Sequence, residues 1–321
     1  MDNYELYHGD CLVESDKIEN GSVDLILTDL PYGTVKNASF YDYCGGVQWD
    51  VIIPTDKVMA VANRILRKNG RMVLFSQEPY TTELINEAIA NVPFNYRMIW
   101  EKDHFANALL SKKAPVSYYE DILVFTKQHD FEGLHPLRRY FKEVIDYMGC
   151  TKKNVIDVIG QKADHVFRVN SSQFDLCTEK TYCELIDLFG IDEMEGFMPF
   201  AELAEINATF NATFNLWNGK EYKGNILKYK KDYNGYHPTQ KPVLLLEDLI
   251  KTFSNRNNLV VDLTMGSGTT GVACMNTNRR FIGIEKEKQY FDIAQKRISE
   301  ASKVTNLFNT EETITEQLCL S

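Results

Sequence analysis

Short apolar runs alternate with longer amphipathic stretches along both flanks of this chain. The runs 23–28 (VDLILT) and 71–77 (RMVLFSQ) have the length of buried strands, and segment 55–70 between them carries apolar residues at helical spacing. Strands that alternate with helices are typical of a parallel sheet covered by helices, so the sequence predicts an α/β fold. Further strands are expected at 96–102, 121–127, 259–263 and 280–285, and further helices at 80–91, at 242–253, from 269 and from about 288.

The alternation stops between residues 130 and 235, where aromatic, basic and turn-rich pieces replace the long apolar runs. This break predicts an inserted module, 130–235, within a discontinuous domain made of 1–129 and 236–321. Inside the module, two short amphipathic helical patterns flank an MGCT turn, and a third helix is expected after Gly160. That spacing predicts a helix-turn-helix, although three helices that pack only on one another would produce the same pattern.

Composition narrows the class of protein without deciding its function. The chain has 321 residues, of which 44% are hydrophobic and 25% are charged, enough for one large domain or two modest ones. No apolar stretch approaches the roughly 20 residues that span a bilayer, and the first ten residues lack the features of a signal peptide. We therefore expect a cytoplasmic protein that makes no contact with a membrane.

Cysteine usage and net charge limit the partners of the chain. Its seven cysteines form no CxxC pair, so we expect reduced thiols and no metal site. The net charge of −10 argues weakly against a nucleic-acid partner, but a local basic face could still bind one.

A glycine loop follows the expected strand at 259–263. The stretch 260–271 (VVDLTMGSGTTG) runs from strand to loop to helix, so backbone amides at the helix start can face an anionic or polar ligand. The next strand ends at Glu285, where a carboxylate can accept hydrogen bonds from both hydroxyls of a ribose. These features predict a site for a cofactor that carries a nucleoside.

Two rival cofactors fit parts of this loop. A phosphate-binding P-loop is disfavoured because no Lys follows the last glycine. A nicotinamide cofactor remains open, because Gly266, Gly268 and Gly271 satisfy GxGxxG. However, Asp262 would repel a pyrophosphate, whereas it suits the ammonium and sulfonium of S-adenosylmethionine.

The stretch 28–33 (TDLPYG) ends the strand at 23–28 with an acid, a proline and an aromatic ring. These are common turn residues, but they would also stand at the carboxyl edge of the sheet, where open α/β sheets bind ligands. Together with 262–271 and with 237–242 (HPTQKP), this stretch resembles motifs of the amino-group DNA methyltransferases. The order of the three motifs is that of the permuted β class, and 8–12, 100–102 and 122–127 resemble its secondary motifs.

The resemblance implies a Rossmann-like methyltransferase fold, a mostly parallel seven-stranded sheet with helices on both faces, and an inserted, mainly helical target-recognition region. It also implies how 28–33 would act. The lone pair of an exocyclic amino nitrogen is delocalised into the base ring, so the nitrogen needs acceptors for its protons. Asp29 and the carbonyl of Leu30, stiffened by Pro31, would be those acceptors, and Tyr32 would stack on the extruded base.

The family pattern also suggests the target atom. An acid at the first position of this motif mostly accompanies N6 of adenine, and a serine N4 of cytosine, so Asp29 favours adenine and leaves N4-cytosine as the alternative. The family usually has proline where Leu30 stands, and we expect the substitution to be tolerated because the backbone carbonyl is the acceptor.

The resemblance also implies the binding sites. For S-adenosylmethionine, the residues implied are Asp10 and Cys11 at the adenine ring, Glu285 at the ribose, Asp262, Gly266, Gly268 and Thr269 at the methionine moiety, Thr239 and Lys241 at its carboxylate, and Thr264 and Lys286 as further contacts with the cofactor. For duplex DNA, the candidates are Lys112, Lys113, His165, Arg168, Gln173, Lys223 and Lys230.

Two other classes of function stay open on the sequence alone. One is a nicotinamide-dependent oxidoreductase, and the other is a DNA-binding protein that has lost catalysis. A homodimer is compatible with the sequence. No nuclease motif is visible, so a restriction endonuclease, if the protein has one as partner, is a separate chain.

Overall fold

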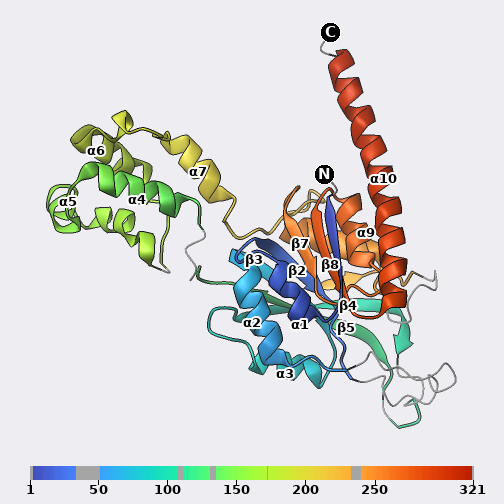
Figure 1. Ribbon diagram of the computed structural model, residues 1–321. Coiled ribbons are helices and arrows are strands. Elements are labelled where there is room, and N and C mark those ends of the chain that lie inside the picture. Colours follow the sequence, from blue (N-terminus) through green and yellow to red (C-terminus); the bar gives the residue numbers. More distant parts are fainter. Residues whose placement is uncertain are drawn as a thin grey trace. The chain divides into compact units, whose positions relative to one another are not determined.

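The computed structural model describes residues 3–33, 51–106, 111–113, 115–130, 135–171, 173–232 and 240–319. The chain forms two compact units. The first, here called the sheet unit, comprises Met1–Leu66, Gly70–Thr126 and Thr213–Ser321. The second, the helical unit, comprises Arg67–Asn69 and Lys127–Ala212. In Figure 1 the helical unit carries the labels α4 to α7.

A mostly parallel sheet of eight strands forms the centre of the sheet unit. Its order is β1-β8-β7-β2-β3-β5-β4-β6, and β5 alone runs antiparallel to its neighbours. All six residues of β2 are buried, which is why they read as a continuous apolar run in the sequence. The strands are β1 (Tyr4–His8), β2 (Val23–Thr28), β3 (Leu66–Ser76), β4 (Phe94–Ala106), β5 (Ser117–Thr126), β6 (Ile226–Lys228), β7 (Leu259–Asp262) and β8 (Arg280–Glu285).

Helices cover both faces of the sheet, because successive side chains of a strand point to opposite faces (Figure 1). Ile26 of β2 belongs to one hydrophobic core, together with α1, α2 and α3. Leu25 and Leu27 belong to the other, together with α8, α9 and α10. The bounds are α1 (Cys11–Glu14), 3-10 helix η1 (Ser15–Lys17), α2 (Thr55–Ile65), α3 (Tyr80–Asn86), α8 (Val243–Phe253), α9 (Thr269–Asn276) and α10 (Lys288–Cys319).

The helical unit has a hydrophobic core of its own. Helix α4 (Leu137–Met148) ends at Gly149, whose φ of 61° is left-handed, and α5 (Lys152–Ile159) begins after Thr151, whose hydroxyl accepts from the Asn154 amide. The two expected helices around the MGCT turn are therefore confirmed. The remaining helices are the 3-10 helix η4 (Gln161–Asn170), α6 (Glu179–Phe189), η5 (Ile191–Glu193) and α7 (Phe200–Ala208).

Three details differ from the sequence-based expectations. The sheet has eight strands where seven were expected, because β6 pairs with the edge strand β4. The two units divide the chain at other residues than 130 and 235, since 213–232 lies in the sheet unit. Helix α2 ends at Ile65, before Gly70, because Leu66 turns to extended backbone and starts β3 beside Val23.

Candidate active site

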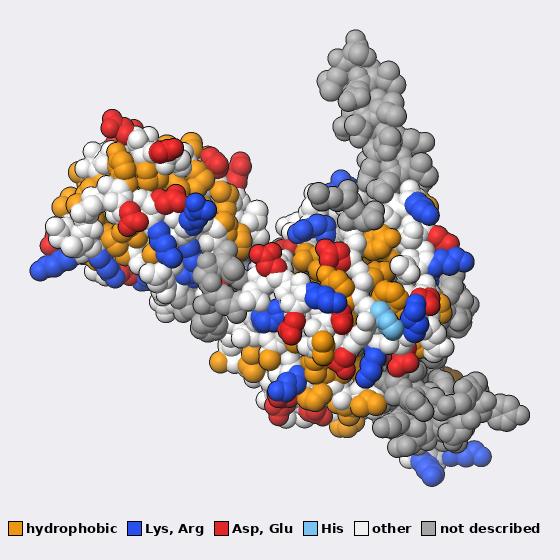
Figure 2. Space-filling view, viewed as in Figure 1, with side chains coloured by type: hydrophobic (Ala, Val, Ile, Leu, Met, Phe, Trp, Pro, Cys, Tyr) orange, Lys and Arg blue, Asp and Glu red, His pale blue; other side chains and the backbone are white. Residues whose placement is uncertain are grey.

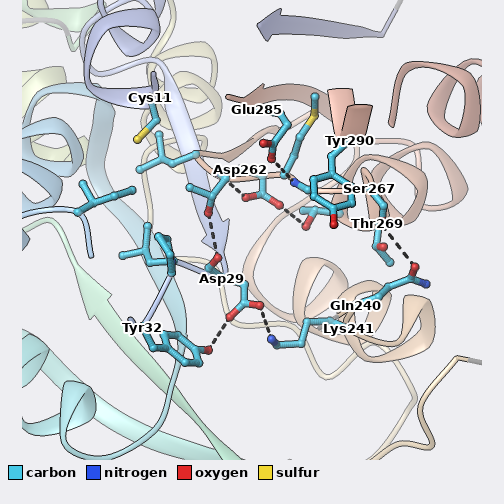
Figure 3. A pocket seen from close by; sticks show the side chains of 18 of the residues that line it. Cys11, Asp29, Tyr32, Gln240, Lys241, Asp262, Ser267, Thr269, Glu285 and Tyr290 are labelled. Carbon is cyan, nitrogen blue, oxygen red and sulfur yellow. Dashed lines mark hydrogen bonds and ion pairs between the residues drawn. The ribbon is translucent and has the colours of Figure 1, made fainter. Parts of the chain in front are cut away.

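A cavity of about 540 Å³ opens at the carboxyl edge of the parallel strands (Figure 3). Its walls come from segments far apart in the sequence, which meet because parallel neighbouring strands deliver their following loops to the same edge. Asp29 follows β2, Gly266 lies in the loop after β7, and Glu285 ends β8. Asp10 follows β1.

The loops after β2 and β7 are joined directly by hydrogen bonds. The Thr28 hydroxyl donates to the Asp262 carboxylate at 2.8 Å, and the Thr264 hydroxyl donates to the backbone carbonyl of Asp29 at 3.0 Å. The two hydroxyl oxygens lie 2.9 Å apart. Asp29 of the stretch 28–33 and the glycine loop of 262–271 therefore face one cavity.

Asp29 has a partner on each carboxylate oxygen (Figure 3). The Tyr32 hydroxyl donates to Oδ1 at 2.5 Å, and the Lys241 ammonium is paired with Oδ2. Burial raises the pKa of Asp29, and the charge of Lys241 opposes that rise. Burial also raises the pKa of Tyr32 well above its usual value, so the phenol stays protonated and acts as a donor.

The glycine loop places a backbone amide against Glu285. The Gly266 amide donates to Oε2 at 2.8 Å, and the Glu287 amide donates to Oε1 at 2.7 Å. Burial raises the pKa of Glu285, and these amides oppose the rise. Gly268 has a φ of 79°, and a Cβ there would stand 2.8 Å from the Cβ of Ala294, so the loop accepts only glycine at this position.

Asp262 is buried under the cavity wall and is bound on both oxygens. Oδ1 accepts from the Thr28 hydroxyl and from the Thr264 amide at 3.1 Å, and Oδ2 accepts from Thr270 at 2.6 Å. Burial raises its pKa to about 6, against the effect of these hydrogen bonds. Asp262 therefore ties the loop to β2 in addition to facing the cavity.

The structure brings most of the cofactor and base candidates to this cavity. Gly268 supports the loop from behind, and Thr239 lies outside the described residues. The lining includes Asp10, Cys11, Asp29, Leu30, Pro31, Tyr32, Lys241, Asp262, Thr264, Gly266, Thr269, Glu285 and Lys286.

Sequence reasoning missed several lining residues. Gln240 stands inside the HPTQKP stretch, and its position between two named candidates was the available signal. Its buried amide nitrogen has no hydrogen-bond partner among the residues that the structure describes. Glu120 and Lys102 also line the cavity, and the signal for them was a charge placed in or beside an apolar strand run.

The candidates for DNA contact are placed very differently from one another. Lys112, Lys113, Gln173 and Lys230 are exposed. His165 is half-buried, and the Arg168 guanidinium is paired with Asp164 at 2.7 Å.

Lys223 must be removed from these candidates. Its ammonium is 2.6 Å from the Asp248 carboxylate and its side chain is 10% exposed. Asp248 also accepts from Trp217 and Tyr229, each at 2.9 Å. Lys223 therefore holds 213–232 against α8.

Comparison with known proteins identifies the class. The family profile described as DNA methylase, for N6 and N4 methyltransferases, matches residues 23–296. The chain therefore belongs to the N6/N4 amino-group DNA methyltransferases, and its substrate is DNA. This membership sets aside the nicotinamide-dependent alternative.

Individual relatives match the chain to different extents. The DNA adenine methyltransferase YhdJ of Escherichia coli (strain K12) is 26% identical over 301 residues, which cover 92% of this chain and 83% of that protein. The type II methyltransferase M2.DpnII of Streptococcus pneumoniae is 44% identical over 93 residues, which cover 28% of this chain and 34% of that protein.

Solved structures share the fold. The complex of M1.HpyAVI with SAM matches 92% of this chain and 99% of its own, with a TM-score of 0.50 and 20% identity. The PvuII DNA methyltransferase, described as cytosine-N4-specific, matches 95% of this chain and 94% of its own, with a TM-score of 0.51 and 14% identity.

Two kinds of feature are absent from the described residues. Within these ranges, no three His, Cys, Asp or Glu side chains are grouped so that they could hold a metal ion. No helix in the described part of the chain is long and apolar enough to cross a membrane.

Proposed function

We propose that this enzyme transfers the methyl group of S-adenosylmethionine to N6 of an adenine extruded from duplex DNA. The observation that carries the proposal is the shared cavity in which Asp29 meets the glycine loop, joined by the 3.0 Å hydrogen bond from Thr264. Adenine is favoured over cytosine because the first motif begins with Asp29 and because YhdJ, a DNA adenine methyltransferase, aligns with 92% of the chain.

The cavity offers groups that fit each part of this cofactor. The two oxygens of Glu285 are fixed by the amides of Gly266 and Glu287, and each keeps a lone pair for a ribose hydroxyl. The unpartnered amide nitrogen of Gln240, buried among the described residues, needs an acceptor, and the methionine carboxylate would supply one. Asp10 would accept from the adenine amino group. The bound cofactor would supply a methyl group on a sulfonium, an electrophile for a nitrogen lone pair.

The chain activates and places the target amino group. Asp29 and the carbonyl of Leu30 would accept its two protons, which favours a pyramidal nitrogen with an available lone pair. The Leu30 side chain is 2% exposed and packs in the core, so it anchors this backbone where the family has proline. Tyr32 would stack on the base and replace part of the stacking lost on extrusion.

Two surfaces would contact the DNA. On the hairpin of β4 and β5, exposed Phe105 and Tyr118 have ring centroids 5.9 Å apart, and Lys112 and Lys113 are exposed between the strands. Since His104 lines the cavity one residue before Phe105, this hairpin would touch DNA beside the extruded base.

The helical unit would be the target-recognition region. Its α4 and α5 have the order and turn of a helix-turn-helix, and the exposed Lys153 and Asn154 lie at the start of the second helix, where such motifs contact base edges. Figure 2 shows basic side chains along the lower border of this unit and acidic ones along its upper border, so phosphate contact is expected at the basic border.

The base specificity is tested by nucleoside mass spectrometry of plasmid DNA from cells that express the protein. We expect N6-methyladenine among the nucleosides of that DNA. N4-methylcytosine would establish the alternative base, and unmodified DNA from cells that contain the folded protein would contradict the proposal. A cytoplasmic location, a homodimer and a separate restriction endonuclease stay predictions; light scattering checks the dimer.

A further inference from the structure

Four charged side chains of alternating sign form a row along the cavity wall, and two of them stand on strands β5 and β4. The Lys241 ammonium is paired with Asp29 and lies 3.2 Å from the Glu120 carboxylate, whose other oxygen lies 2.5 Å from the Lys102 ammonium. The exposed fractions are 25% for the Asp29 side chain, 6% for Lys241, 11% for Glu120 and 5% for Lys102. Three of the four side chains are therefore almost fully buried. A buried charge without a partner is costly.

Each of these four side chains stabilises the charge of its neighbour in the row. Burial alone would lower the pKa of Lys241, but the carboxylates of Asp29 and Glu120 raise it above its usual value. Burial would raise the pKa of Glu120, but Lys241 and Lys102 lower it. At Asp29 burial is the stronger influence and raises the pKa, and Lys241 is the largest influence in the opposite direction.

The arrangement matters because an acid that takes up a proton is a poor acceptor. Protonated Asp29 would carry a donor on one oxygen and could no longer accept from the target amino group on that side. Lys241 binds Oδ2 and Tyr32 binds Oδ1, so the carboxylate is held at both oxygens.

We infer that Lys241, supported by Glu120 and Lys102, is a positioning residue that keeps the Asp29 carboxylate ionised and oriented as the acceptor for the target amino group. The inference rests on the proposed function and adds to it. It gives Lys241 a different role from the contact with the methionine carboxylate that the family resemblance implied.

Other charged and titratable groups surround these four side chains. Asp262 interacts with Asp29 from β7, and Tyr32 contacts Asp29 from its own loop. The pKa of Lys231 is lowered, first by burial and then by the charges of Lys102 and Lys241. Tyr80 faces Tyr32, with ring centroids 5.8 Å apart.

The test compares Lys241→Met with wild type in two measurements. The first is the pH profile of kcat at saturating S-adenosylmethionine and duplex DNA. Without the ammonium, the pKa of Asp29 rises further, so activity should be lost at a higher pH as the solution is acidified, by about 1–3 pH units. The second is the Kd for S-adenosylmethionine by calorimetry, which should change less than threefold.

Two further variants keep the inference open to refutation. In Glu120→Gln, the pH at which kcat falls on acidification (the acidic limb of the profile) should shift in the same direction by a smaller amount. This variant replaces Lys241→Met in the test if Lys241→Met does not fold. Lys241→Arg keeps the charge and should leave the acidic limb near its wild-type position.

Two results would overturn the inference. An equal loss of activity at every pH in Lys241→Met would show a merely structural role. A Kd for S-adenosylmethionine weakened tenfold or more with an unshifted profile would return Lys241 to the methionine carboxylate. Failure of the proposed function itself would appear elsewhere, as full activity in Asp29→Ala.

Discussion

The hydroxyl of Thr264 donates a 3.0 Å hydrogen bond to the backbone carbonyl of Asp29, a residue 235 positions earlier in the sequence. This bond joins the loop that would hold the methyl donor to the loop that would hold its acceptor. Because methyl transfer depends on placing the nitrogen, the methyl carbon and the sulfur nearly in line, small displacements between these loops should be costly.

Thr264→Val removes this hydroxyl and keeps a similar volume. The variant should lose about 1 kcal/mol of unfolding free energy, because one hydrogen bond is lost at a half-buried site. It should lose more in kcat, about tenfold to a hundredfold, since the two loops are no longer held in register. Urea unfolding and single-turnover methylation measure the two effects. Thr264→Ser restores the hydroxyl and should recover most of kcat; no recovery would separate the bond from catalysis.

Tyr32 has two separable parts, a ring and a hydroxyl. Tyr32→Phe loses only the 2.5 Å hydrogen bond to Asp29, so it should retain base extrusion. Tyr32→Ala should weaken extrusion by about 1–3 kcal/mol, the usual contribution of stacking one base on an aromatic ring. Fluorescence of 2-aminopurine at the target position reports extrusion directly. Equal fluorescence for the two variants would argue against a stacking role.

Gly268 is required by its backbone conformation and by its neighbour. In Gly268→Ala the new Cβ would lie 2.9 Å from the Cα of Ala294, a backbone atom of α10, at a φ of 79°. The variant should lose about 1–3 kcal/mol of unfolding free energy and bind S-adenosylmethionine more weakly. Thermal unfolding and calorimetry measure both. Gly224→Ala is the matched control, because within the described part of the chain no atom beyond its two chain neighbours lies within 4 Å of the added Cβ.

Lys223 should contribute to stability and not to DNA binding. Lys223→Ala leaves the buried Asp248 carboxylate without its cation, which should cost about 3 kcal/mol of unfolding free energy. The salt dependence of DNA affinity should stay unchanged. Lys228→Ala is the control, since that side chain is 73% exposed, and it should leave stability near wild type. A stable Lys223→Ala protein with a reduced salt slope would reverse this assignment.

The sequence predicted the two loops that form the site, the one after β2 and the one around Gly266, because each follows a regular pattern of apolar residues. The six buried residues of β2 and the strand, glycine loop and helix around Gly266 are local patterns, and parallel pairing brings their loops to one edge. The spatial relation of Asp29 to residues 262–264 could therefore be predicted from the sequence alone.

Other features depend on contacts that leave little trace in the sequence. Strand β6 has only three residues; it pairs with β4, and Leu227 is the one residue of the strand that is buried in the core. Glu120 of β5 lies opposite Trp100 of β4, which makes Lys102 its diagonal neighbour across two antiparallel strands. The pairing of Glu120 with Lys241 requires the segment before α8 to return to the same cavity. Lys223 was a candidate for DNA contact in the sequence, and only the position of Asp248 on α8 shows that its ammonium forms an internal ion pair.

The role of Asp29 as the acceptor for the target amino group is tested by comparing wild type with Asp29→Ala in transfer of a labelled methyl group to adenine-containing duplex DNA. Binding of S-adenosylmethionine is measured in the same preparations. The variant should bind the cofactor with a Kd close to that of wild type and transfer no methyl group. Undiminished transfer by the folded variant would contradict this role.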